Sequence, residues 1–306
     1  MIGRRWRRWA LVAFVTGVLA VGAVSWQLAN ILVGSANHRV TMPTDFSAAT
    51  VSIPGKGHTI AGTWRDLGGD SPVVLLLHGF RGDRASMLPR ARLLVDAGFS
   101  VLLIDQQGHG ETPGEHITLG WLESADARAA RDWIRTQAPG RRVGVVGVSL
   151  GGASVLLGSQ PAGFDAVVLE AVYPRVRRAV ENRVGLRFGG LDQLLASLLL
   201  VQIEPRLHVT VEQLEPIRFI AQVGAPVMVV GGSRDAHTTE EDTRELFAAA
   251  AEPREIWIVE GAAHQDFSRF DQAGYDAHVV SFLRKWCQAG KVGITPSGTN
   301  PRSTSE

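Results

Sequence analysis

Cysteine is almost absent from this sequence. Cys287 is the single cysteine in 306 residues, so an intrachain disulfide is excluded, and the redox character of the compartment stays open on this count. We interpret Cys287 as a small hydrophobe that is buried or partly exposed. The chain also has little net charge, +1 at pH 7, and this balance gives no indication of a nucleic-acid partner.

Sequence signatures of cofactor binding are missing too. The chain contains no internal repeat, no metal-ligand cluster, no phosphate-binding loop and no dinucleotide fingerprint. We therefore expect neither a metal nor another cofactor. Apolar residues make up 45% of the chain, an ordinary share for a globular protein, and the length allows one large α/β domain of about 250 residues.

Four arginines stand before an uncharged stretch at the N-terminus: Arg4, Arg5, Arg7 and Arg8. No charged residue then occurs until Arg39. The apolar residues 10–33 can cross a ~30 Å hydrocarbon core at ~1.5 Å per residue. Because positively charged flanks stay in the cytoplasm, we predict that residues 1–9 are cytoplasmic, residues 10–33 are a transmembrane anchor, and the rest of the chain is extracytoplasmic.

Two other interpretations of this N-terminal segment stay open. One is a cleaved signal peptide, with an apolar section from Ala10 to Val24 and a small-x-small cleavage site at Ala23 and Ser25. In that case the mature protein would be secreted. The other is a helix buried in the protein.

Short strands and helices alternate between residues 50 and 289, after a linker at residues 34–49. "ATVSIP" and "HTIAGTW" predict a hairpin, and "WLESADARAARDWIRTQ" has helical spacing at Trp121, Ala125, Ala129 and Trp133. Continuous apolar runs such as "PVVLLLHG", "FSVLLID" and "APVMVVGG" are typical of strands buried on both faces. The pattern predicts an α/β fold with a mostly parallel sheet flanked by helices. The Gly/Ser/Thr/Pro-rich residues 290–306 are predicted to be a disordered tail.

A serine lies between glycines in "GVSLG", Gly147 to Gly151, within the predicted strand "RRVGVVGVS" and at its end. A G-x-S-x-G motif between a strand and a helix predicts a sharp turn that lifts the hydroxyl of Ser149 above the sheet edge. The alternative is a glycine-rich turn in which the Ser149 side chain caps the following helix.

A serine hydroxyl needs a base, and the base needs an orienting acid, before it can act as a nucleophile. The motif class predicts the chain order serine, acid, histidine, each after a strand. Asp235 follows "APVMVVGG" and His264 follows "REIWIVEGA", both at the carboxyl end of a predicted strand, where open α/β sheets place their sites. We therefore predict that Ser149, Asp235 and His264 form a catalytic triad.

Other residues could fill the same roles. Glu170, after the run "AVVL", and Asp266, beside the histidine, are alternative acids. His109, in "DQQGHGET", is expected in a turn after its strand, and His237 is too close to Asp235 to be the base that this acid orients.

Five segments carry a resemblance to a known family: "LLLHGFRGD", "LLIDQQGHGET", "VGVSLGG", "APVMVVGGSRD" and "GAAHQDF". The chain resembles serine hydrolases of the α/β-hydrolase fold over most of residues 50–289. It is similar to the branch that contains the membrane-associated ABHD13- and ABHD17-type hydrolases, monoacylglycerol-lipase-like esterases and serine-aminopeptidase-like domains. The family commonly has a His-Gly pair where this chain has Gly231-Gly232.

The resemblance places Ser149, Asp235 and His264 on the catalytic positions of the family. The backbone N–H groups of Phe80 and Leu150 fall on its oxyanion-hole positions, with His78 and Gly79 shaping the loop that carries Phe80. The implied activity is hydrolysis of carboxylic ester or thioester bonds through an acyl-enzyme. The implied partners are a small-molecule or lipid ester and the membrane, with no obligate protein partner.

An insertion at residues 174–216 precedes the strand that carries Asp235. It contains apolar residues at helical spacing: Leu191, Leu194, Leu195, Leu198, Leu199 and Ile203. An apolar helix in a cap over the site suggests an acyl chain as ligand, and the alternative is a helix packed on the core. Two other functions stay open: an aminopeptidase-like serine peptidase, which carboxylates clustered near the site would favour, and a non-catalytic binding module.

Overall fold

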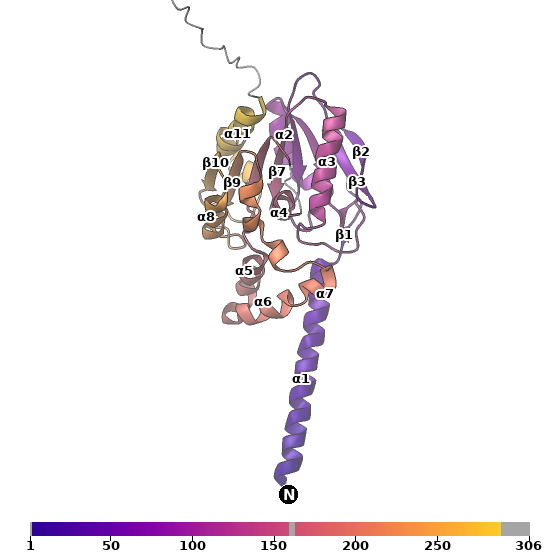
Figure 1. The fold of residues 1–306 in the computed structure, drawn as a ribbon, viewed down its shortest axis with the longest axis vertical. Helices are drawn as coiled ribbons and strands as arrows, with labels where there is room; N and C mark the ends of the chain where they lie inside the picture. Colours follow the sequence, from indigo (N-terminus) through magenta and orange to yellow (C-terminus); the bar gives the residue numbers. More distant parts are fainter. Residues whose placement is uncertain (1, 159–162, 289–306) are drawn as a thin grey trace, which may run out of the picture.

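The computed structural model describes residues 2–158 and 163–288. It shows a central sheet with helices on both faces and a long N-terminal helix that projects away from the domain (Figure 1). The eight strands of the sheet lie in the order β10-β9-β8-β7-β4-β5-β3-β2. Their bounds are β2 Ala49–Pro54, β3 Thr59–Arg65, β4 Val73–Leu77, β5 Ser100–Ile104, β7 Val143–Val148, β8 Ala166–Glu170, β9 Val227–Gly232 and β10 Arg254–Val259.

Six of these strands run parallel, from β5 across to β10, while β2 and β3 form the antiparallel hairpin expected from the sequence. The fold is therefore the α/β-hydrolase fold that the sequence predicts. The α-helices are α1 Ile2–Val33, α2 Leu88–Asp96, α3 Glu123–Gln137, α4 Leu150–Leu156, α5 Val176–Phe188, α6 Asp192–Leu200, α7 Ile203–Leu207, α8 Glu240–Ala249, α9 Phe267–Phe270, α10 Gln272–Tyr275 and α11 Ser281–Leu283.

Strand β4 shows how the apolar runs build two core layers. Side chains at alternate positions of a strand face opposite sides of the sheet. Helices cover both sides here, so all five residues of β4 are buried. Leu75 and Leu77 pack in the layer that contains α3 and α4, while Val74 and Leu76 pack in the layer that contains α2 and α11. Cys287 lies buried in the second layer, as predicted.

The segment after α1 is part of the fold although we expected a linker there. Its residues Ala36–Asn37 form β1, which pairs in parallel with β6, His109–Gly110. Phe46 is buried in the core layer with α2. The segment therefore fixes the end of α1 to the domain.

Helix α1 has a mean hydropathy of 1.9 in its apolar window within Arg5–Val33, and that window is not buried by the protein. It is long and apolar enough to cross a membrane, and a signal sequence near the N-terminus would have the same properties. The interpretation as a helix buried in the protein is wrong, because α1 projects from the domain (Figure 1).

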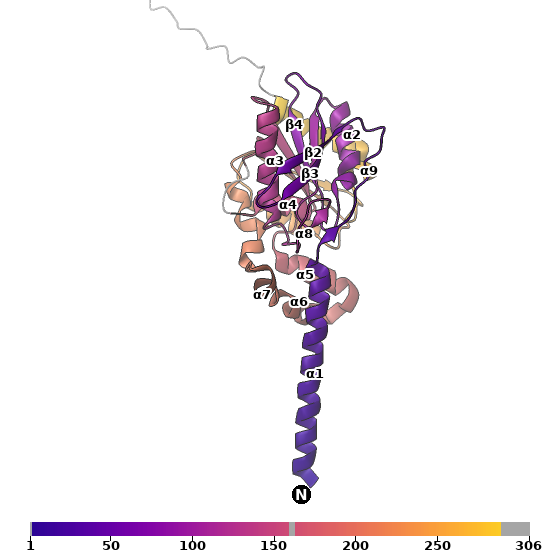
Figure 2. The same cartoon turned by 90° about the vertical axis from the view of Figure 1, so that its right-hand side faces the viewer.

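The insertion between β8 and β9 folds as helices α5, α6 and α7, which lie beside the end of α1 that meets the domain (Figure 2). Helix α6 is partly packed on the core, as the alternative interpretation expected: Ala196 and Leu200 are buried. Its opposite side is not, since the Leu194 side chain is 62% exposed. The side chain of Leu191 and all of residues 290–306 lie outside what the structure describes.

Candidate active site

Ser149 lies in the tight turn between β7 and α4, with φ 50° and ψ −110°. A positive φ is unusual for a residue with a side chain, so surrounding contacts must hold it. The helix approaches the sheet closely: a Cβ on Gly151 would lie 2.4 Å from the Leu77 carbonyl oxygen, and one on Gly147 would lie 2.6 Å from the Gly152 Cα. Glycine at these positions therefore permits the turn.

The Ser149 side chain does not cap α4. The alternative in which this serine serves only as a helix cap is therefore wrong. The backbone N–H of Ser149 donates to the Glu170 carbonyl oxygen at 2.8 Å, which ties the turn to the end of β8.

The structure brings Asp235 and His264 together. The Nδ1 atom of His264 lies 2.7 Å from Asp235 Oδ2. The other carboxylate oxygen, Oδ1, accepts the backbone N–H groups of His237 at 2.8 Å and Thr238 at 2.9 Å. These bonds fix the carboxylate, and the carboxylate fixes the imidazole, leaving its Nε2 as the nitrogen free to exchange a proton with a substrate or nucleophile.

Ser149 Oγ has no hydrogen bond to His264 within residues 2–158 and 163–288. Contacts between a nucleophile and its base are commonly long in a free enzyme and tighten when substrate binds. The structure thus unites the acid and the histidine, and it leaves the bond from serine to histidine as a prediction.

Both alternative acids are bound to Arg90 of α2. The buried Glu170 carboxylate accepts Arg90 Nη2 at 2.6 Å and the Tyr275 hydroxyl at 2.7 Å. Asp266 lies 3.1 Å from Arg90 Nη1 and caps α9. A charge-assisted pair of this kind occupies the carboxylate oxygens, so the geometry favours Asp235 as the acid that orients His264.

Of the two predicted oxyanion donors, Leu150 directly follows Ser149, and Phe80 directly follows Gly79, where an added Cβ would lie 3.6 Å from the Ser149 Cβ. The Leu150 N–H is at the first residue of α4, and neither it nor the Phe80 N–H is used in a hydrogen bond in the described part of the chain. The Gly79 carbonyl accepts His78 Nδ1 at 2.8 Å and the Gly82 N–H at 3.0 Å. Because C=O and N–H of one peptide point in opposite directions, these bonds set the direction of the Phe80 N–H.

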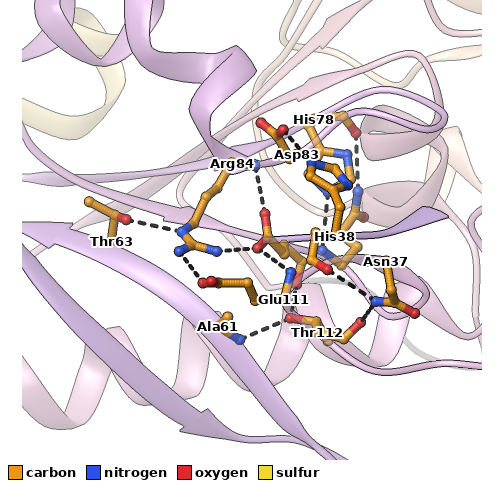
Figure 3. Close-up of polar contacts among 12 residues, drawn as sticks. Asn37, His38, Ala61, Thr63, His78, Asp83, Arg84, Glu111 and Thr112 are labelled. Atoms are coloured by element: carbon orange, nitrogen blue, oxygen red, sulfur yellow. Dashed lines mark hydrogen bonds and ion pairs between the residues drawn. The ribbon is translucent and has the colours of Figure 1, made fainter. Parts of the chain in front are cut away.

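A charged network that sequence reasoning missed holds the loop after β4 in place. The Arg84 guanidinium binds the buried Asp105 carboxylate and lies 2.5 Å from Glu111 Oε2 (Figure 3). His38 Nε2 lies 3.0 Å from Asp83 Oδ2, which joins the segment after α1 to the same loop (Figure 3). The sequence did contain one signal for this network. Arg84 follows β4 and Asp105 follows β5, the two residues have opposite charges, and the two strands lie side by side in the sheet.

His109 closes a turn after β5, as expected, because its N–H donates to the Gln106 carbonyl at 3.0 Å, and it is also buried inside the domain. Its ring packs edge to face on His78 with the ring centroids 4.8 Å apart. Burial lowers the pKa of each imidazole to about 4. The Gln106 N–H donates to His78 Nε2 at 3.1 Å, so His78 is neutral with its proton on Nδ1, the form that donates to Gly79.

Comparison with known proteins agrees with this architecture. A family model described as "Serine aminopeptidase, S33" matches residues 70–218. The chain is 35% identical over 201 residues to the uncharacterised protein Rv2307c of Mycobacterium tuberculosis, and the match covers 65% of this chain and 65% of that protein's length. It is 20% identical over 219 residues to YqkD of Bacillus subtilis, covering 70% of this chain and 72% of that protein.

Solved structures show the same fold. The esterase Pf2001 of Pyrococcus furiosus superimposes with a TM-score of 0.68 at 22% identity, covering 83% of this chain and 98% of that one. XC6422 of Xanthomonas campestris, described as a serine hydrolase without a lid, gives 0.55 at 16% identity, covering 82% and 99%. The chain therefore has the α/β-hydrolase fold.

The neutral state of His109 predicts a pH-dependent stability. A folded-state pKa of about 4, below the usual 6.5, means that the unfolded chain binds this proton more tightly. The contribution of neutral His109 to the stability of the folded protein is complete above about pH 6.5 and is lost as the pH falls toward 4. We expect His109→Asn to flatten the fall in the thermal unfolding midpoint between pH 7 and pH 4.

The matched control is His208→Asn, at an exposed position with φ 55° where asparagine fits well. Glu123 and Asp126 have raised pKa values and titrate in the same range, but they are present in all the proteins compared. If the unfolding midpoint of His109→Asn falls between pH 7 and pH 4 as steeply as that of the wild type, then His109 is protonated in the folded protein and the prediction is wrong.

Proposed function

We propose that this protein is a membrane-anchored serine hydrolase that cleaves carboxylic ester or thioester bonds. The observation that carries the proposal is the 2.7 Å contact between His264 Nδ1 and Asp235 Oδ2, at the sheet edge where the Ser149 turn also lies. The three residues follow β7, β9 and β10, and parallel strands bring their carboxyl ends to one edge. The intact contact between acid and histidine argues against a non-catalytic binding module.

The chemistry follows from the placement of each group. His264 Nε2 takes the proton of Ser149 Oγ as the oxygen attacks the substrate carbonyl. The Phe80 and Leu150 N–H groups stabilise the negative oxygen of the tetrahedral intermediate. The C–O or C–S bond then breaks, and the leaving alcohol or thiol takes the proton from His264. Water, activated by the same imidazole, hydrolyses the acyl-enzyme and restores Ser149.

The ion pairing of the nearby carboxylates favours an ester over a peptide as the substrate. A site for a substrate amine needs free negative charge, whereas Glu170 and Asp266 are paired with Arg90 and Asp242 is paired with Arg178. The esterase name of the Pyrococcus neighbour supports the same choice. The aminopeptidase description of the matching family model keeps a peptidase as the second candidate. Within the fold, we propose kinship with the membrane-associated ABHD13/ABHD17-type branch.

The nucleophile can be tested by covalent labelling. A fluorophosphonate should label the full-length protein at Ser149, because this reagent requires a serine activated by a base. Ser149→Ala should abolish both labelling and hydrolysis of p-nitrophenyl esters, while Ser154→Ala, five residues further along α4, should keep both. Equal labelling of the Ser149→Ala protein would show that another residue is the nucleophile.

The acid can be tested by comparing two carboxylates. Asp235→Asn should lower kcat by about 10³–10⁴-fold, because the imidazole loses its orienting anion. Glu170→Gln weakens the buried pair with Arg90 and should lower stability, yet change kcat per active site far less. The measurement is kcat normalised by active-site titration. The reverse order of effects would make Glu170 the acid.

We also propose that the catalytic domain lies outside the cytoplasm, with the N-terminus inside, because four arginines in the first two turns of α1 precede its uncharged part. A reporter enzyme fused after Glu306 should be active only when it is extracytoplasmic. The mature protein should retain residues 1–30 and stay with the membrane after an alkaline wash. Soluble protein whose sequence begins near Trp26 would show a cleaved signal and overturn the anchor, without affecting the hydrolase proposal.

A further inference from the structure

The end of α1 packs against the cap formed by α5, α6 and α7. Ser25 Oγ of α1 accepts the side-chain amide of Gln202 at 2.7 Å and lies 3.5 Å from the Leu198 carbonyl oxygen of α6. The Arg206 guanidinium of α7 donates to the Trp26 carbonyl at 3.1 Å and lies 4.0 Å from the centre of the Trp26 ring. Both views show α6 and α7 beside this end of α1 (Figures 1 and 2).

The same end of α1 is bound to the loop that carries the oxyanion donor. Arg81, the residue after Phe80, donates to the carbonyl oxygens of Ile31 at 3.2 Å and Gly34 at 3.3 Å. The Ile31 carbonyl belongs to the last turn of α1, where carbonyls have no helical partners, and Gly34 directly follows that turn. The carboxyl edge of the sheet, where the site lies, is therefore held beside the point at which α1 enters the domain.

The length of α1 sets the depth of the cap relative to a bilayer. The rise from Arg8 to Ser25 is about 26 Å at ~1.5 Å per residue. A hydrocarbon core of ~30 Å that begins just after Arg8 therefore extends slightly past Ser25. That core ends about 20 residues after Arg8, so the contact between Ser25 and α6 and the pairing of Trp26 with Arg206 lie within about 5 Å of its far boundary, where aromatic side chains and long cationic side chains that reach the headgroups are common.

The side of α6 that continues from this contact is apolar and exposed. Val201 directly follows α6 and continues its last turn, because its N–H donates to the Ser197 carbonyl at 3.1 Å. It lies seven residues after Leu194, which places both on one face, and the Leu198 backbone that meets α1 lies between them. Their side chains are 62% and 72% exposed, and Leu186 of α5 is 55% exposed. We call these three residues the cap face.

We propose that the cap face of Leu186, Leu194 and Val201 is a second membrane-contacting surface, which inserts into the headgroup layer of the leaflet where α1 ends. The occupant is the lipid bilayer, because the face continues from α1 at the bilayer boundary. The active-site edge is then held next to the lipids. It follows, resting on the proposed hydrolase function, that the substrate is an acyl ester drawn from that leaflet.

Site-directed quenching tests the contact in the full-length protein. Cys287 is buried, so a fluorophore will label a single introduced cysteine selectively. The protein would be reconstituted in phosphatidylcholine–phosphatidylglycerol vesicles that contain brominated lipids. Fluorophores at Leu194→Cys and Val201→Cys should be quenched severalfold more than one at Leu67→Cys, an exposed leucine between β3 and β4 at the opposite edge of the sheet.

Leu19→Cys, midway along α1, is the positive control. Quenching at Leu194 and Val201 no stronger than at Leu67 would overturn the proposal, as would a lack of quenching at Leu19, because α1 would then not cross the bilayer. None of these outcomes depends on catalysis, so they leave the proposed hydrolase activity untouched, although a lack of quenching at Leu19 would also overturn the proposed membrane anchor.

Kinetics test the substrate source separately. Leu194→Ser should lower kcat/KM for a long-chain acyl ester in vesicles about tenfold relative to kcat/KM for soluble p-nitrophenyl acetate. If the quenching is as expected but Leu194→Ser leaves the ratio of the two kcat/KM values unchanged, the membrane contact is supported and the proposal of a lipid substrate is wrong. Absence of any Ser149-dependent hydrolysis, with the quenching as expected, would overturn the proposed function and keep the contact.

Discussion

The close approach of α4 to strands β7 and β4 is the constraint on which the site depends. Side chains at Gly147 or Gly151 would collide with backbone atoms, so only glycine lets the helix begin directly above the sheet edge. This contact forces Ser149 into its positive φ, points the chain into α4, and leaves the Leu150 N–H unbonded within the described residues. The other site residues then gather at the same edge, because β4, β9 and β10 run parallel to β7.

The buried guanidinium of Arg90 gives the carboxylates near the site different roles. Arg90 binds Glu170 and Asp266, so the two alternative acids serve to hold the loops around the site. Asp235 is held by backbone N–H groups and faces His264. Removing one partner from a buried pair such as Arg90–Glu170 is costly, typically ~3–5 kcal/mol, which explains how a network outside the reaction can still govern the geometry of the site.

The sequence predicted the fold well because its strongest signals are local: unbroken apolar runs for the parallel strands, and a hairpin at residues 49–65. The contact between Asp235 and His264 followed from their order after those strands. Long-range contacts were not readable. Arg90 and Glu170 are 80 residues apart in the chain, and Ser25 and Leu198 are 173 apart. Burial of polar groups was not readable either: Glu123 is buried in α3 because its carboxylate accepts the N–H groups of Thr118 and Gly120, whereas Trp121 and Trp133 are only half-buried.

The central claim is that the Ser149 turn and the Asp235–His264 pair act together through an acyl-enzyme. The most direct measurement uses an aryl carbamate, because the carbamoyl-enzyme that it forms is hydrolysed slowly enough to be isolated. Reaction should release one equivalent of the aryl alcohol per protein, and mass spectrometry should place one carbamoyl group on the peptide that contains Ser149. Release of the alcohol with no adduct on Ser149, or an adduct that persists in Ser149→Ala, would contradict the account.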